Sequence, residues 1–273
     1  MAMDNSLKKQ LIEALKDQRD IFGDELFEKN ILRKTKIENV PDKATAKANK
    51  KNAEKIEFIP NVKNKKVEEE ALFEKPKESW ELSKNLDELN KLICDCQKCP
   101  LGSTRNKFVF GSGNSDADVL VVGEGPGADE DAQGLPFVGR AGKLLTDILK
   151  AIKFERDEVY IANVVKCRPP GNRTPYPQEM DTCLPYLNKQ IELIKPKLIL
   201  CLGLTAAQGL LKKKDSLTNM RGKVFELEVN PRYKVKAMVT YHPAALLRNP
   251  NWKRGCWEDV QQFRKLYDEM VED

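Results

Sequence analysis

Four short apolar runs, separated by segments of helical spacing, constrain the fold of this chain more than any other feature. The runs cover residues 118–123, 159–167, 197–203 and 235–241, and helical spacing is found over residues 142–152, 178–194, 205–211 and 252–270. A short continuous apolar run is typical of a strand buried on both faces. Strands that alternate with helices predict an α/β fold, with a four-stranded parallel sheet flanked by helices.

The carboxyl ends of parallel strands are where such sheets bind their ligands. Three motifs follow predicted strands: the glycine-rich loop that begins GEGPG at residue 123, the segment 163–170, and His242. Taken alone, the glycine-rich loop fits a phosphate-binding loop or a structural turn equally well. It lacks the GKS or GKT ending of a nucleotide P-loop.

The first third of the chain differs from the rest in composition. Residues 1–35 contain apolar residues at helical spacing and predict a helical segment. Residues 36–80 are rich in Lys, Asn, Ala and Glu, which predicts a disordered, flexible linker. This linker is either a solvated spacer or a loose tether for DNA, and the extension is a candidate site for a protein partner. Residues 81–273 form the predicted catalytic domain.

Charge and targeting signals narrow the class of protein. Lys plus Arg number 47 and Asp plus Glu number 42, so the formal net charge is +5, which permits nucleic-acid binding without requiring it. The opening residues lack the apolar core of a signal peptide, and no apolar run is long enough to span a membrane. We therefore expect a cytoplasmic protein with no membrane association.

The seven cysteines are grouped rather than evenly spread. Cys96 and Cys99 form a Cys-x-x-Cys pair, and Cys167 and Cys183 follow after a long gap. In a reducing compartment, grouped cysteines indicate a metal site or catalysis more often than disulfides. On spacing alone, four such thiolates fit zinc or a [4Fe–4S] cluster equally well, and unrelated buried cysteines are a third alternative.

Four separated motifs together resemble one known family. In order they read GEGPGADED, GLPFVGRAGKLL, NVVKCRPPGNRTP and TYHPAALLRNP. They resemble family 4 of the uracil-DNA glycosylases, the iron–sulfur members of that superfamily, over residues 90–265. The resemblance implies a monomeric enzyme that flips uracil out of DNA and hydrolyses its N-glycosidic bond. The product would be an abasic site, which starts base excision repair. It also implies a structural [4Fe–4S] cluster on the four cysteines.

The resemblance assigns roles in the uracil pocket. Phe137 matches the aromatic residue that stacks on the flipped base, and Asn163 matches the residue that reads the edge of uracil. His242 matches the residue beside O2 that stabilises the charge on the leaving base. Glu124 and Gly125 stand in the loop where other families carry a water-activating Asp. Glu124 therefore positions water or steadies the sugar cation, or it instead crowds C5 and excludes the thymine methyl group.

Loops are expected to supply the contacts with DNA. Arg168 and Arg173 lie on a proline-rich segment suited to gripping phosphates, although a solvated face is the simpler alternative for Arg173. Leu246 or Leu247 is the candidate wedge into the base stack, with Arg248 beside it.

Three other classes of protein compete with the glycosylase. A relative that captures uracil-DNA covalently would need a histidine in an inserted loop after PFVGR, and here RAGKLL follows directly. A non-catalytic iron–sulfur DNA-binding module would release no uracil. A zinc-stapled nucleotide-binding protein would contain zinc and lack the brown colour of a cluster.

Overall fold

The computed structural model describes residues 78–272 of the chain. The predicted helical segment over residues 1–35 and nearly all of the predicted linker over 36–80 lie outside the described residues. The described part begins with a 3₁₀ helix, η2 (Ser79–Leu82), followed by helices α2 (Leu86–Ile93) and α3 (Leu101–Thr104). Asn85 caps α2 through its side chain, which accepts a hydrogen bond from the Glu88 amide at 2.8 Å.

A mixed sheet with the strand order β1-β3-β2-β4-β6-β5 forms the centre of the described region. Its four inner strands are parallel: β3 (Tyr160–Asn163), β2 (Val119–Gly123), β4 (Leu198–Leu202) and β6 (Tyr233–Thr240). The predicted α/β class is confirmed and these are the four predicted strands, but the sheet has six strands and is mixed rather than four-stranded and parallel. Two antiparallel strands, β1 (Ser112–Gly113) and β5 (Val224–Asn230), extend it at the edges.

The edge strands were not predicted because neither contains a continuous apolar run. Strand β1 has only two residues, and β5 alternates partly buried and exposed side chains. Such alternation is usual for a strand with one face in solvent. The second predicted strand is shorter than expected, because β3 ends at Asn163 rather than at residue 167.

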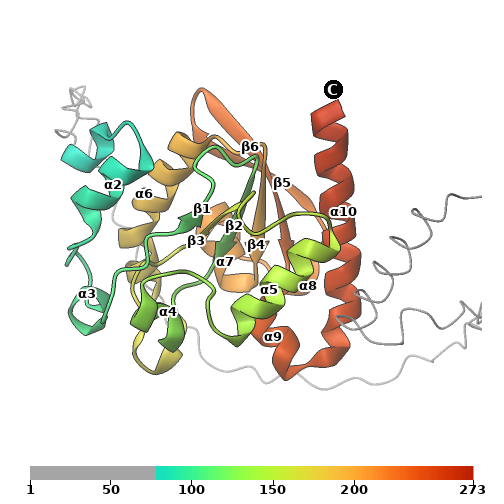
Figure 1. Ribbon diagram of the computed structural model, residues 1–273, viewed down its shortest axis with the longest axis horizontal. Helices are drawn as coiled ribbons and strands as arrows, with labels where there is room; N and C mark the ends of the chain where they lie inside the picture. Colours follow the sequence, from blue (N-terminus) through green and yellow to red (C-terminus); the bar gives the residue numbers. More distant parts are fainter. Residues whose placement is uncertain (1–77, 273) are drawn as a thin grey trace, which may run out of the picture. The chain divides into compact units, whose positions relative to one another are not determined.

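Helices cover both faces of the sheet (Figure 1). Leu120 and Val122 belong to a core with α2, α6 (Pro177–Ile194) and α7 (Leu204–Leu211). Val119 and Val121 point to the other face and pack with α5 (Arg140–Ala151), α9 (Pro243–Arg248) and α10 (Lys253–Glu272). Burying both faces explains why the two central strands, β2 and β4, contain no polar side chain. Among the described helices, none is both long and apolar enough to cross a membrane.

The remaining described elements are short and connect the larger ones. Helix α4 (Ala128–Gln133) follows β2, and η3 (Pro170–Asn172) precedes α6. Helix α8 (Leu217–Met220) precedes β5, and η4 (Pro250–Trp252) separates α9 from α10. Helices α3, α4 and α9 lie at the same end of the molecule (Figure 1), which is the end where the parallel strands terminate.

Candidate active site

A cavity of about 380 Å³ opens at the carboxyl ends of β2, β3 and β6. The predicted pocket residues line it together, along with two of the predicted DNA-contact residues: Glu124, Gly125, Phe137, Asn163 and His242, with Arg173 and Arg248. Their position follows from the topology, because the segments that leave parallel strands meet at one edge of the sheet. The structure therefore brings together residues that are far apart in the sequence.

Asn163 is the last residue of β3, and its side chain is 2% exposed. Its Oδ1 atom is the one buried side-chain oxygen or nitrogen within residues 78–272 that has no hydrogen-bond partner. Buried polar atoms are nearly always paired, and leaving one unpaired costs about 1–3 kcal/mol. The site therefore holds an amide group that is ready for the polar edge of a ligand.

Gly123 makes room for that amide group. It is paired with Asn163 across the neighbouring strands β2 and β3. A Cβ atom on Gly123 would lie 2.4 Å from Asn163 Oδ1 and 2.6 Å from Phe137 Cζ. Both distances are too short, so any larger residue would push the two ligand-facing side chains away from their positions.

Phe137 forms a flat wall of the cavity and is 7% exposed. Its backbone has a positive φ of 52°, which is a strained conformation for a bulky residue. A Cβ atom on Gly142 would lie 1.9 Å from the Phe137 carbonyl oxygen, so the loop packs directly on α5. The ring centroids of Phe137 and His242 are 5.5 Å apart, with 32° between their planes.

Glu130, which sequence reasoning missed, holds the two loops around the Phe137 ring. Its Oε1 atom accepts hydrogen bonds from the backbone amides of Val138 at 2.9 Å and Gly139 at 3.0 Å. Its Oε2 atom accepts one from Gly127 at 3.1 Å. One carboxylate therefore joins the first turns of α4 and α5. The signal in the sequence was the Glu at the third position of α4, after the glycine N-cap.

His242 caps α9, and its Nδ1 atom accepts a hydrogen bond from the Ala244 amide at 3.1 Å. That bond places the proton of the neutral ring on Nε2. Burial, together with the nearby charge of Arg248, lowers the pKa of His242 to about 4, and Glu130 partly opposes the shift. The imidazole is therefore neutral at physiological pH and can donate one hydrogen bond through Nε2.

Glu124 and Gly125 form the wall on the side of β2. The Glu124 carboxylate has no hydrogen-bond partner within the described residues, and its backbone carbonyl accepts a bond from the Val165 amide at 3.1 Å. A Cβ atom on Gly125 would lie 2.6 Å from Val165 Cγ2, so the loop passes close to the segment after β3. The carboxylate of Glu124 is thus available to a ligand or to water.

The four predicted ligand cysteines lie close to one another, next to the segment that leaves β3. The Cys167 thiol is within electrostatic range of Cys96 and Cys99, and the Cys183 thiol is within range of Cys167 and Cys99. Burial raises the pKa of Cys167, and it raises that of Cys183 to about 12. Among the described residues, no three His, Cys, Asp or Glu side chains converge on a position for a single metal ion.

Hydrogen-bond donors surround these sulfur atoms. Arg105 Nη1 donates to Cys167 Sγ at 3.3 Å, and the Lys166 amide donates to Cys183 Sγ at 3.3 Å. The hydroxyl group of Tyr186 lies 3.3 Å from Cys96 Sγ. Such donors favour negatively charged sulfur.

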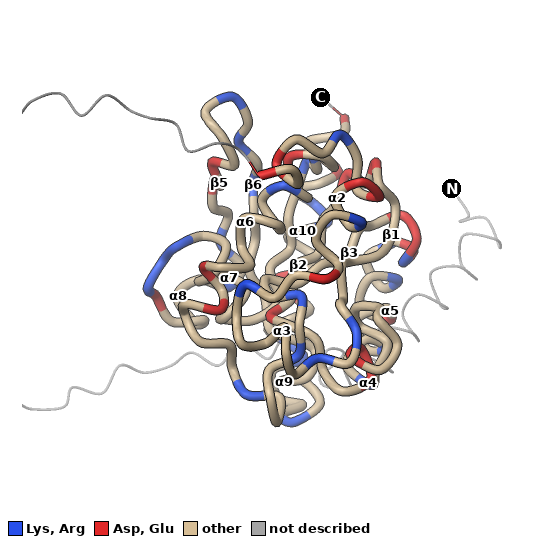
Figure 2. Tube along the Cα trace, turned by 90° about the vertical axis from the view of Figure 1, so that its left-hand side faces the viewer, with Lys and Arg blue, Asp and Glu red and all other residues tan. Residues whose placement is uncertain are grey.

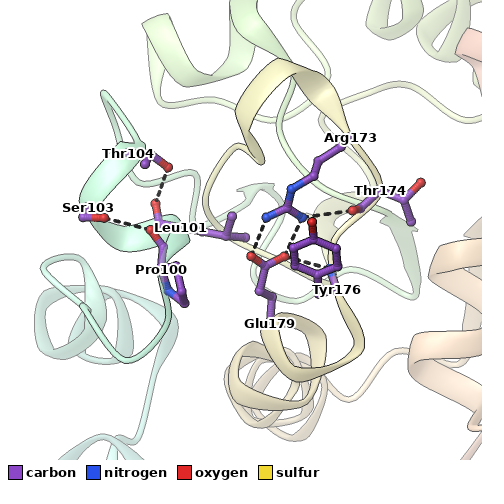
Figure 3. A network of polar contacts seen from close by, with 8 residues as sticks. All are labelled: Pro100, Leu101, Ser103, Thr104, Arg173, Thr174, Tyr176 and Glu179. Atoms are coloured by element: carbon purple, nitrogen blue, oxygen red, sulfur yellow. Dashed lines mark hydrogen bonds and ion pairs between the residues drawn. The ribbon is translucent and has the colours of Figure 1, made fainter.

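Arg173 lines the cavity, but its guanidinium group is already engaged (Figure 3). Nη1 and Nη2 donate to the Glu179 carboxylate at 2.8 and 2.7 Å, and the Tyr176 ring lies 3.8 Å from the guanidinium carbon. Glu179 is 3% exposed and raises the pKa of Arg173 through these bonds. Arg173 therefore braces the loop before α6, and its predicted contact with phosphate stays a prediction.

The other predicted DNA-binding residues are placed differently. Arg168 is half-buried and donates from Nε to Asn172 Oδ1 at 2.8 Å, and Arg248 is exposed at the cavity mouth. Leu247 is 39% exposed, whereas Leu246 is fully buried in the core with α5 and α10. The prediction of Leu246 as a wedge is therefore wrong, because its side chain packs inward. Lys and Arg also occur on the loops near α3 and α9 (Figure 2).

Fold and site together define an α/β protein with a cavity at the carboxyl ends of its parallel strands, lined by an aromatic ring, an imidazole and an unpaired amide oxygen. Residues 110–261 match the family model of the uracil DNA glycosylase superfamily. The chain is 44% identical to a type-4 uracil-DNA glycosylase of Archaeoglobus fulgidus, over 67% of this chain and 93% of the relative. Type-4 enzymes of Pyrobaculum aerophilum and Thermotoga maritima are each 43% identical over 66% of this chain, and 93% and 95% of theirs. The chain belongs to the uracil DNA glycosylase superfamily, within its type-4 group.

Proposed function

We propose that this protein removes uracil from DNA by hydrolysing the N-glycosidic bond, which leaves an abasic site for base excision repair. The observation that carries the proposal is the unpaired Oδ1 atom of Asn163 in a cavity walled by Phe137 and His242. The type-4 uracil-DNA glycosylases that the chain resembles support the same reaction. A glycosylase must take its base out of the stack, and the cavity is where the flipped base would bind.

Asn163 reads the base. Its amide oxygen accepts a hydrogen bond from N3–H of uracil, and its amide nitrogen donates one to O4. Cytosine presents an acceptor at N3 and a donor at C4, which is the reverse pattern. Gly123 leaves the space that this amide occupies, since a Cβ atom there would clash with Asn163 Oδ1.

Phe137 holds the base, and His242 stabilises the charge that the base acquires as it leaves. The Phe137 ring stacks on the flipped base and holds it in the plane that Asn163 reads. The Nε2–H group of His242 donates to O2, where negative charge develops as the bond to the sugar lengthens. A preorganised donor in a water-poor site stabilises such charge strongly, and a neutral imidazole is sufficient for this role.

Glu124 lies where it can act on water or on the base. It either positions the attacking water and steadies the sugar cation, or occupies the space beside C5 and excludes thymine. If uracil departs before water attacks, the reaction needs little help from a general-base catalyst. The lack of an Asp in this loop is therefore compatible with activity.

Cys96, Cys99, Cys167 and Cys183 are the residues that would hold a [4Fe–4S] cluster. The fit rests on the grouping of the four sulfur atoms and on the donors from Arg105 and Lys166, which suit a negatively charged thiolate set. In a [4Fe–4S] cluster each thiolate binds a different iron. The four sulfur atoms therefore need not converge on the position of a single metal ion. When bound, the cluster would tie the loop after α2 to β3 and α6 as a structural staple.

DNA containing uracil is the proposed partner. Arg168 and Arg248 would contact phosphates, and Leu247 would enter the base stack that uracil leaves. Residues 81–273 would be sufficient for catalysis, because every residue of the proposed site lies within them.

The test uses a labelled oligonucleotide with a single uracil, followed by alkali, which cleaves abasic sites. Full-length protein is first shown by its visible absorbance to contain the cluster. We expect cleavage at uracil, and none in a matched oligonucleotide with thymine. Cluster-loaded, folded protein that leaves the uracil strand intact would overturn the proposal.

A further inference from the structure

Lys166 is a fully buried lysine between the base-reading residue and the cysteine set. It follows Asn163 by three residues and precedes Cys167 by one, and its side chain is 0% exposed. Lysine is almost never fully buried without a partner, because transfer of an ammonium group out of water is costly. The burial of the Lys166 ammonium group therefore requires an explanation, because Lys166 neither lines the uracil pocket nor belongs to the four cysteines.

The Lys166 side chain folds back onto the strand that carries Asn163. Its Nζ atom donates to the main-chain oxygen of Asn163 at 3.0 Å and to Oε1 of Gln190. Gln190 is also fully buried, and its Nε2 atom donates to the Phe110 carbonyl at 3.0 Å. Lys166 therefore fixes the peptide group from which the Asn163 side chain projects, and Gln190 fixes Lys166 in turn.

Lys166 lies beside the cysteine set. Within residues 78–272, its ammonium group makes no ion pair with a carboxylate, and Cys167 is the next residue in the chain. The backbone amide of Lys166 donates to Cys183 Sγ at 3.3 Å. One residue thus contacts the base reader through its ammonium group and the ligand set through its amide group.

We propose that Lys166 is a positioning residue that couples the iron–sulfur site to the uracil pocket. The negative charge of the four-cysteine cluster is the counter-charge for the buried ammonium group, and the ammonium group holds the main chain at Asn163. The inference rests on the proposed function and deepens it, because it gives the cluster a defined effect on base recognition. The cluster then does more than join distant segments of the chain.

The test compares Lys166→Met with wild type as full-length, cluster-loaded protein. Methionine keeps most of the length and removes the charge. We expect the reduction potential of the cluster to become more negative, because a nearby positive charge that favours the reduced state is lost. We also expect about a ten-fold weaker affinity for free uracil, with a larger effect on KM than on kcat. Lys212→Met, which removes an exposed charge paired with Asp181, is the matched control and should change neither quantity.

A second variant tests the hydrogen bond of Lys166 without removing its charge. It also keeps the test decisive if Lys166→Met fails to fold. Gln190→Leu keeps the ammonium group but removes one of its two acceptors. It should weaken uracil affinity and leave the reduction potential unchanged. Lys166→Met that matches wild type in either potential or uracil affinity would overturn the coupling, as would Gln190→Leu with wild-type affinity. Failure of the proposed function would instead appear in wild type, as brown, folded protein that releases no uracil.

Discussion

Replacing Asn163 by Leu should make the protein more stable and less active. Leucine has nearly the shape of asparagine and no polar atoms. In the free protein, Asn163 Oδ1 is buried without a partner, so the wild-type side chain destabilises the fold. Most substitutions at buried positions lower stability. An increase here would therefore identify the amide as a group kept for its ligand.

The magnitude follows from the cost of an unpaired buried acceptor, about 1–3 kcal/mol. For a domain of this size, each kcal/mol shifts the melting temperature by roughly 2–4 °C. We expect a rise of several degrees, reduced by any strain that the branched Leu side chain causes beside Gly123. The same substitution removes both hydrogen bonds to uracil, so the excision rate should fall at least ten- to a hundred-fold.

The two measurements are thermal unfolding without DNA and single-turnover excision from a uracil oligonucleotide. Asn219→Leu is the control for stability, because the Asn219 amide is exposed and donates to Asp215 at 2.9 Å. It should not raise the melting temperature. A less stable Asn163→Leu variant would show that Oδ1 is satisfied in the free protein. A folded variant with the wild-type excision rate would show that Asn163 does not read the base.

Four further predictions concern other parts of the site. Because the pKa of His242 is about 4 in the folded protein and near 6.5 when unfolded, its neutral form contributes about 3 kcal/mol of stability. That contribution is complete above pH 6.5 and lost as the pH falls toward 4 in denaturant titrations, and the excision rate should show no histidine step near pH 6.5. Glu130→Gln keeps one acceptor oxygen but loses the second, so uracil KM should rise several-fold with a small loss of stability; unchanged KM would contradict its hold on the Phe137 loop. Cys167→Ser should reduce soluble yield and iron content before it affects chemistry, and brown protein with full iron would refute its role as a ligand. Leu247→Ala should slow excision from double-stranded DNA more than from single strands, and equal losses on both would argue against a wedge.

The parallel core and the position of the site were predictable because each depends on a local pattern. A strand buried on both faces must lack polar side chains, and residues 119–123 and 198–202 show this directly. Once the strands are parallel, their carboxyl ends converge, so Asn163 and His242 must lie near each other. The edge strand β5 gave no such signal, since half of its side chains face solvent.

Other features depend on contacts that a one-dimensional pattern does not contain. Leu246 and Leu247 are chemically identical, and only the phase of α9 against α5 and α10 decides which is exposed. From the sequence alone, Arg173 is interpreted as a free cation. In the structure, the turn before α6 places the Glu179 carboxylate against it. The role of Glu130 is likewise hidden, because its partners are backbone amides, which every residue carries.

Three energetically unfavourable features of the described region lie at or beside one cavity. Asn163 leaves a buried acceptor unpaired, Phe137 holds a positive φ, and Lys166 buries an ammonium group beside the same strand end. Each costs on the order of 1–3 kcal/mol or more by itself. An uninterrupted apolar core on each side of the sheet offsets these costs. The strain therefore lies where a ligand can relieve it, since uracil would pair the Asn163 amide and cover the Phe137 ring. Binding of uracil should then rigidify the site, with the rest of the sheet unchanged.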